Sequence, residues 1–455
     1  MFPNPQDALP LPPRPSLERY RKLAKDLVKA CKEAGEPGST SGGADSVSAW
    51  AEEWAGAWID ALVRLSGIQL DPQLPVRVER WIDDVAGFAQ RQLAGNERRC
   101  ALADAQFVIA RSHGFESWPK FARCLDALAH GAASSESRFE SAADATVAGD
   151  AAALNRLLRE EPALIRMRSM REHGATLLHY VSANGIEGYR QRTPRNIVEI
   201  AELLLEAGAD VNATANVYGG GCMTLGLTAT SLHPERAGVQ EELMRTLLEH
   251  EAKIDERLVN SCLANGRAQA AEFIAGRAAR LDLDEAAGVG RLDLVRETFA
   301  ADGGLQSIFG MEEWKREFWY ACQFGRNAVI EYLLDVGFDP AMADGDGQTG
   351  LHHAVIGGNP EGVALLLKHK PPLEATNIYG GTVLGQALWS AAHGGDVESY
   401  IAILEALTDA GARLPERHVP VNARIDAWLE ARGSHAEHGW YWGGERPRAG
   451  RGKTG

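Results

Sequence analysis

Apolar pairs recur along this chain at a fixed interval, and the polar turn that precedes each pair recurs with them. Two leucine pairs, at 333–334 and 366–367, stand 33 residues apart, and so do Thr349 and Thr382. A constant period of this size is typical of a stacked array, in which each unit buries its apolar face only against its neighbours. The pattern therefore predicts successive helix pairs over most of the chain.

The unit at 345–376 shows the predicted elements most clearly. Its Asp346-Gly347 pair suits a turn, and Thr349 can cap a helix through its hydroxyl. Gly358 suits the end of this first helix, because glycine enters the left-handed conformation at little cost. A second helix follows and buries its leucine pair.

This unit resembles the ankyrin repeat, whose pattern runs Thr-Pro-Leu-His-x-Ala, then a glycine, then a leucine pair. Thr349, Leu351, His352 and Ala354 match that pattern, and Gly350 stands where the family has proline. The resemblance implies an all-α fold, an ankyrin-repeat solenoid of stacked helix-turn-helix units. It also implies a surface that is presented to a protein partner rather than a pocket for a substrate.

The same landmarks place an ankyrin array at 138–415. The leucine pair follows the glycine by 8 residues in three units, those of Gly149, Gly325 and Gly358. Several other units keep only part of the motif, and the array is interpreted as about 8 units. One fixed offset in three separate units argues against coincidence.

The segments outside the array are assigned from their periodicity. Residues 16–130 have helical period without repeat landmarks, and Trp50, Trp54 and Trp58 fall on one helix face, where core packing is favoured over an aromatic ligand shelf. The Gly-Phe-x-Ser-Trp-Pro string at 114–119 resembles the helical leader of a group of bacterial ankyrin proteins, so a capping role is expected. The remaining segments are a disordered start at 1–15, a C-terminal cap at 416–439 and a disordered tail at 440–455.

The threonines and histidines of the repeat motif are assigned a structural role. His179 follows Thr176 at the offset at which His352 follows Thr349, and Thr382 opens a further unit. In ankyrin repeats this histidine ties neighbouring turns together by hydrogen bonds. A catalytic duty is the minority interpretation, because an unpaired buried polar group would be costly.

Three units are longer than the others, and the extra residues lie between their first and second helices. The insertions are at 188–194, 231–236 and 392–396, and loops at one position of a stacked array emerge on one edge. Arginines gather in the first two, so this edge is a candidate anchor for an acidic partner segment. Solvated surface loops are the other interpretation. The candidate partner-binding residues of this edge are Tyr189, Arg190, Arg192, Arg195, His233, Arg236 and His393.

A second repeated string lies at the turns that precede two of the units. The strings at 216–220 and 377–381 both read Asn, an aliphatic residue, Tyr, Gly, Gly. Turn geometry explains the glycines. Tyr218 and Tyr379 are candidate partner anchors if they are exposed, and packing across the turn is the alternative.

The composition narrows the class of partner and the compartment. A formal net charge of −15 argues against wholesale binding of nucleic acid or acidic membranes. No apolar run approaches the ~20 residues of a membrane helix, and no signal segment is visible, so a cytoplasmic location is expected. The cysteines are widely spaced and are expected to be reduced, buried small hydrophobic residues: Cys31, Cys100, Cys124, Cys222, Cys262 and Cys322.

No motif in the sequence supports catalysis. Walker loops, His-Glu-x-x-His and Gly-x-Ser-x-Gly are missing, and a zinc site at His173, His179 and Glu187 is only a remote alternative. Two hypotheses remain. The first is a non-catalytic, monomeric scaffold without cofactor that binds a protein partner through its turn tips, its concave face or the insertion loops. The second is a hydrolase-like or metal-dependent site built by the insertions beside the array. Arg190, His233 and acids converging in a cleft would favour the second.

Overall fold

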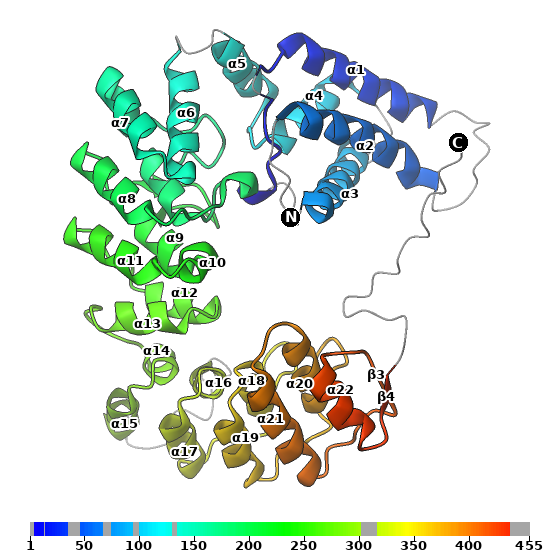
Figure 1. Cartoon of the computed structure of the whole chain (residues 1–455), viewed down its shortest axis with the longest axis vertical. Helices are drawn as coiled ribbons and strands as arrows, with labels where there is room; N and C mark the ends of the chain where they lie inside the picture. Colours follow the sequence, from blue (N-terminus) through cyan, green and yellow to red (C-terminus); the bar gives the residue numbers. More distant parts are fainter. Residues whose placement is uncertain are drawn as a thin grey trace. The chain divides into compact units, whose positions relative to one another are not determined.

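The computed structural model describes most of the chain and divides it into two compact units. Unit 1 is Met1–Asp255 and unit 2 is Glu256–Gly455. Figure 1 shows helices throughout, with only short strands. Unit 1 contains both the leader helices and the first repeats. The described residues are 4–12, 14–34, 46–66, 74–93, 100–129, 134–301 and 316–436.

The helices of the N-terminal third pack around a core of their own within unit 1. In chain order they are α1 (Leu17–Glu33), α2 (Ser46–Ser66), α3 (Leu74–Leu93), α4 (Leu102–Ser112) and α5 (Trp118–Ala129). Both α1 and α3 pack against α2 and α4. The indoles of Trp54 and Trp58 are buried, with ring centroids 5.1 Å apart, so they belong to this core.

A disulfide joins the last turn of α1 to Cys100, two positions before the start of α4. Cys31 and Cys100 are 69 residues apart in sequence, and their Cα atoms are 5.9 Å apart. The expectation that every cysteine is reduced is wrong for this pair, because helix packing brings together two thiols that are distant in sequence. The other cysteines are free: Cys124, Cys262 and Cys322 are buried, and Cys222 is half-buried.

The N-terminal segment, residues 4–12, is ordered, contrary to the expectation for residues 1–15. It begins with the short 3-10 helix η1 (Pro5–Asp7), after which Ala8 and Leu9 are almost fully buried. Leu9 joins the core of the leader helices. Burial of this apolar side chain offsets the entropy lost when the segment is ordered.

Three helix pairs follow the leader in unit 1. They are α6 (Ser135–Ala148) with α7 (Ala151–Glu160), η4 (Leu177–Ser182) with α8 (Ile197–Glu206), and α9 (Thr224–Thr230) with α11 (Gln240–Glu249). The first helices stack as α6, η4 and α9, and the second helices stack as α7, α8 and α11. The connections contain η3 (Pro162–Arg166), η5 (Gly188–Arg190), α10 (Leu232–Arg236) and the antiparallel strands β1 (Thr214–Ala215) and β2 (Cys222–Met223). The first two insertions therefore form η5 and α10.

Five helix pairs and a terminal helix make up the described part of unit 2. The pairs are α12 (Leu258–Ala264) with α13 (Ala268–Ala275), α14 (Leu283–Gly288) with α15 (Leu292–Ala301), α16 (Arg316–Gln323) with α17 (Asn327–Asp335), α18 (Gly350–Ile356) with α19 (Pro360–Leu367), and α20 (Val383–Ala392) with α21 (Val397–Asp409). The terminal helix α22 (Ala423–Glu430) lies between the parallel strands β3 (Arg417–His418) and β4 (His435–Ala436).

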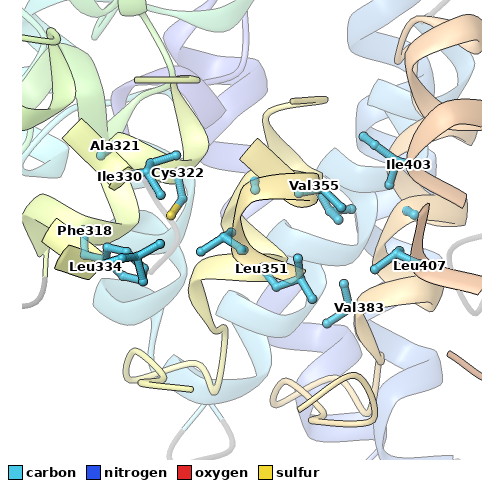
Figure 2. Packing of buried hydrophobic residues seen from close by; sticks show 14 of the residues in the cluster. Phe318, Ala321, Cys322, Ile330, Leu334, Leu351, Val355, Val383, Ile403 and Leu407 are labelled. Carbon is cyan, nitrogen blue, oxygen red and sulfur yellow. The ribbon is translucent and has the colours of Figure 1, made fainter. Parts of the chain in front are cut away.

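The pairs of unit 2 share one continuous core from α14 to α22. Figure 2 shows its middle part, where Phe318, Leu351 and Val383 come from three successive first helices. Side chains of the second helices, among them Leu334 and Leu407, complete it. Each pair thus buries its apolar face against the next pair, as the 33-residue period predicts. The expected C-terminal cap is described up to residue 436.

Glycines end the first helices at the positions the sequence indicated. Gly149, Gly325 and Gly358 have φ angles of 73°, 68° and 60°, in the left-handed region that suits a helix C-terminus. Gly357 serves a different purpose. A Cβ atom on it would lie 1.9 Å from the carbonyl oxygen of Gln323, so the absence of a side chain allows α16 and α18 to approach closely.

Candidate functional site

The turn tip at 377–381 presents two apolar side chains on a fixed backbone. The Oδ1 atom of Asn377 accepts hydrogen bonds from the amides of Tyr379 at 3.1 Å and Gly381 at 3.0 Å. The amide of Ile378 donates to the carbonyl of Asp346, in the preceding tip, at 2.8 Å. With the main chain held in this way, the side chains of Ile378 and Tyr379 are 61% and 82% exposed.

The turn tip at 216–220, which has the same sequence pattern in unit 1, has a different environment. Tyr218 is 62% exposed, but its hydroxyl donates a hydrogen bond to Oδ1 of Asn184 at 2.7 Å. The same hydroxyl accepts a hydrogen bond from Nε2 of Gln6 in the N-terminal segment. Two tips with the same sequence pattern therefore differ in their contacts, since the hydroxyl of Tyr218 is bonded to two other residues of unit 1.

The first insertion does not expose its central arginine. Arg190, expected as a partner anchor, is buried, with only 5% of its surface exposed. Its guanidinium contacts Glu140 Oε2 at 2.8 Å, Asp144 Oδ1 at 2.8 Å and Glu187 Oε1 at 3.4 Å. Three carboxylates that sequence inspection did not connect with Arg190 therefore neutralise it inside unit 1.

A second buried arginine completes this ion-pair network. The Nη1 atom of Arg171 lies 3.0 Å from Glu140 Oε1 and 2.9 Å from Glu187 Oε1, and its Nη2 donates to the Tyr189 hydroxyl at 3.1 Å. Tyr189 is accordingly half-buried and bonded internally, rather than open to a partner. Burial alone would raise the pKa of Glu187, but the charges of Arg171 and Arg190 hold it well below its usual range.

The other basic residues of the insertion edge remain accessible. Arg192 and Arg195 are exposed beside η5, and His233 and Arg236 are exposed on α10. Burial on one side, together with Arg236 and Arg77, lowers the pKa of His233, which favours its neutral form. The edge therefore keeps three exposed arginines, while its expected centre at Arg190 is internal.

The third insertion carries an aromatic stack that the sequence analysis did not single out. His393 is exposed and stacks on Trp389, with ring centroids 4.0 Å apart, and its Nδ1 is 2.7 Å from the Trp389 carbonyl oxygen. Trp389 is itself 45% exposed on α20. A spacing of four residues on one helix was the available signal, because such residues face the same side.

The repeat-motif histidines make the same local contacts in both units. His179 Nδ1 lies 2.8 Å from the Thr176 hydroxyl, and His352 Nδ1 lies 3.0 Å from the Thr349 hydroxyl. Burial lowers the pKa of His179 to about 4 and lowers the pKa of His352 as well. Both imidazoles are therefore neutral at pH 7. Thr382 caps α20 by accepting from the Gly385 amide at 3.2 Å.

The predicted alternative, a metal or catalytic site, receives no support from the described residues. Within them, no group of three or more His, Cys, Asp or Glu side chains could hold a metal ion. His173 Nε2 does approach Glu187 Oε1 at 3.5 Å, whereas His179 bonds to Thr176. Arg190 and its acids converge in a buried network, whereas His233 is exposed and has Arg236 and Arg77 as its charged neighbours.

Comparison with known proteins agrees with the repeated helix pairs. Residues 173–216 match the family model of the ankyrin repeat, and residues 318–416 match a model of ankyrin repeats in three copies. Searches of curated proteins find no match. Among solved structures, the chain is similar to the ankyrin repeat domain of human ASB11, with 18% identity over 60% of this chain and 98% of that chain. That similarity has a TM-score of 0.32.

One further property bears on the class of protein. In the parts of the chain that the structure describes, no helix has both the length and the apolar character needed to cross a membrane. The matched segments fall in both units and coincide with the pairs η4/α8, α16/α17, α18/α19 and α20/α21. The stacked helix pairs, their motif contacts and the matched segments together show that the chain contains ankyrin repeats, at 173–216 and 318–416.

Proposed function

We propose that this chain is a non-catalytic scaffold that binds a protein partner through the turn tip at 377–381, with Tyr379 as the anchor. Ankyrin repeats generally mediate interactions between proteins. The observation that carries the proposal is the 82% exposure of Tyr379 on a main chain held by Asn377. A tyrosine on a preorganised backbone offers a large contact area at little entropic cost, as interface hot spots do.

The neighbouring side chains indicate the chemistry of the partner surface. Ile378 is 61% exposed beside Tyr379, and Trp389 is 45% exposed in the same repeat. Single exposed apolar residues are common, but two apolar side chains on one rigid tip suit a partner with an apolar pocket and a polar rim. The exposed arginines of the insertion edge, Arg192 and Arg195, are a second surface that suits an acidic segment.

The proposal has three finer features. The chain is proposed to act as a monomer, in the cytoplasm and without a cofactor. A disulfide between Cys31 and Cys100 is unusual for a reducing compartment, so the location is the feature that most needs a measurement. Fractionation of the native host with antibody detection tests the location, and sedimentation velocity of the purified chain tests the monomer.

The binding proposal is tested by quantitative capture with the full chain as bait. Proteins captured from the native host are compared between the wild type, Tyr379→Ala and the control Val76→Ala, which truncates another exposed apolar side chain. Loss of a hot-spot tyrosine costs about 2 kcal/mol or more, so recovery of the partner should fall roughly 30-fold for Tyr379→Ala alone. Both variants should keep the wild-type unfolding midpoint. An identical captured set for all three proteins would refute the proposal.

A further inference from the structure

The N-terminal segment lies in a seat formed by three separate parts of unit 1. These parts are the leader helices, the first insertion and the turn tip that carries Tyr218. The segment contacts each of them, although they are distant from it in sequence. Such an arrangement resembles a bound peptide more than a connecting loop.

Leu9 is the anchor of the segment. Its side chain is fully buried in the core of the leader helices. Its amide donates to the carbonyl of Ser112 at 2.7 Å, and its carbonyl accepts from Nδ1 of His113 at 3.0 Å. Burial lowers the pKa of His113 to about 3, so the ring is neutral and its Nδ1 carries the donated proton. Main-chain bonds on both sides of a buried leucine fix the register of the segment.

Two glycines shape the seat around the residues next to Leu9. A Cβ atom on Gly188, in η5, would lie 2.6 Å from the carbonyl oxygen of Gln6. A Cβ atom on Gly114 would lie 3.2 Å from that of Ala8. Side chains at these two positions would push the segment outwards. The seat therefore depends on close main-chain approach at both of its walls.

Polar groups complete the recognition of the segment. The side-chain amide of Gln6 donates to the Tyr218 hydroxyl, which in turn donates to Asn184. Asp7 lies near Arg80 on α3, with 3.7 Å between Oδ1 and Nη2. In sequence order, the side chains of the segment in this seat are therefore an amide, an acid, a small residue and a buried leucine, at residues 6–9.

We propose that this seat is a peptide-binding site, filled here by the chain's own N-terminal segment, and that a partner segment with the same order of side chains competes for it. The contacts support this, because main-chain hydrogen bonds supply affinity and a side-chain pocket supplies specificity in peptide recognition. The seat belongs to unit 1, whereas Tyr379 belongs to unit 2. It also explains why Tyr218 is engaged while Tyr379 is accessible.

The proposal is tested with a full-length chain that can be cut after folding. A protease recognition sequence is inserted next to Arg14, which is exposed, and the purified protein is cleaved without being unfolded. A fluorescent peptide of residues 4–12 is then added to the cleaved and to the intact protein. The peptide should replace the cut segment and bind the cleaved protein at least ~100-fold more tightly, because in the intact chain a tethered copy competes at high effective concentration.

Variants separate the seat from general stability. A peptide with Leu9→Ala should bind on the order of 100-fold more weakly, as loss of a buried leucine predicts. In the cleaved protein, Gly188→Ala should weaken binding of the wild-type peptide, whereas Gly56→Ala is the matched control, since no atom lies within 4 Å of a Cβ placed there. If the cleaved protein unfolds, retains its segment without exchange or binds both peptides equally, the segment is part of the core and the proposal is wrong.

Discussion

The buried ion-pair network of unit 1 allows a sharp test, through the substitution Glu187→Gln. Glu187 is fully buried, and its Oε1 atom faces Arg171 at 2.9 Å and Arg190 at 3.4 Å. Glutamine keeps the volume and removes the charge, so two guanidiniums remain buried against one fewer carboxylate. Removal of one partner from a buried ion pair costs about 3–5 kcal/mol, because the remaining charge is no longer compensated. We expect a loss of that size in the stability of unit 1.

The stability lost in Glu187→Gln should depend on pH, and its direction follows from the pKa of Glu187. The pKa of Glu187 in the folded chain is well below its ordinary value of 4.5, since Arg171 and Arg190 outweigh the effect of burial. A carboxyl with a lowered folded pKa contributes stability that is fully present above the unfolded pKa and is lost as the pH falls through the folded pKa. Wild-type stability should therefore decline more steeply below about pH 4.5 than that of Glu187→Gln.

Hydrogen exchange in the full chain is the appropriate assay, because a chain with two units need not unfold in one step. The amides of α6 and η4 report opening around the network. The control is Glu241→Gln, which breaks an exposed pair with Arg245 on α11 and should cost less than about 1 kcal/mol. If both substitutions change exchange equally, or if Glu187→Gln costs less than the control, the network does not stabilise the fold as argued.

The remaining predictions concern three other places in the fold. Burial raises the pKa of Glu317 to about 8, so the stability of unit 2 should fall between pH 4.5 and about 8, and Glu317→Gln should flatten this slope in urea titrations. Reduction of the Cys31–Cys100 bond, a cross-link worth about 4 kcal/mol, should lower the unfolding temperature of unit 1, and the double serine variant should not respond to reductant. Gly357→Ala should destabilise unit 2 by about 1–3 kcal/mol, as measured by urea unfolding, because its Cβ would lie 1.9 Å from a carbonyl oxygen. Gly385→Ala, whose nearest neighbour would be 3.5 Å away, should be neutral. These expectations would be contradicted, in order, by a pH slope that Glu317→Gln leaves unchanged, by an unfolding temperature that reduction leaves unchanged, or by equal stabilities of the two alanine variants.

Features that depend on neighbouring residues were predictable from the sequence. The cap at Thr349, its bond to His352 and the left-handed glycine at Gly358 all lie within ten residues of one another. Local geometry decides such contacts, so one well-preserved unit and its period were enough to find the array. The burial of Trp54 and Trp58 followed from helical spacing in the same way.

Features that depend on distant residues were not predictable. Arg190 looked like a surface residue because its loop is rich in polar residues, but its partner Glu140 lies 50 positions earlier, on α6. The N-terminal segment looked disordered because it is rich in proline, but Leu9 finds a core that only the folded leader creates. The thiols of Cys31 and Cys100 meet for the same reason. In each case the deciding partner is close in space and remote along the chain.

The turn tips at 216–220 and 377–381 show local and distant effects side by side. Both strings present a tyrosine, Tyr218 in one unit and Tyr379 in the other, but on different turns. The φ angle is positive at Tyr218, Gly219 and Gly220, whereas only Gly380 has a positive φ in the tip at 377–381. The surroundings differ as well, because Gln6 and Asn184 bond the hydroxyl of Tyr218 while Tyr379 remains 82% exposed. A repeated motif can therefore locate a candidate binding residue. It does not tell whether that residue is already bonded to another part of the chain. The tip at 377–381, whose tyrosine is 82% exposed, is therefore the one of the two at which we propose that a partner binds.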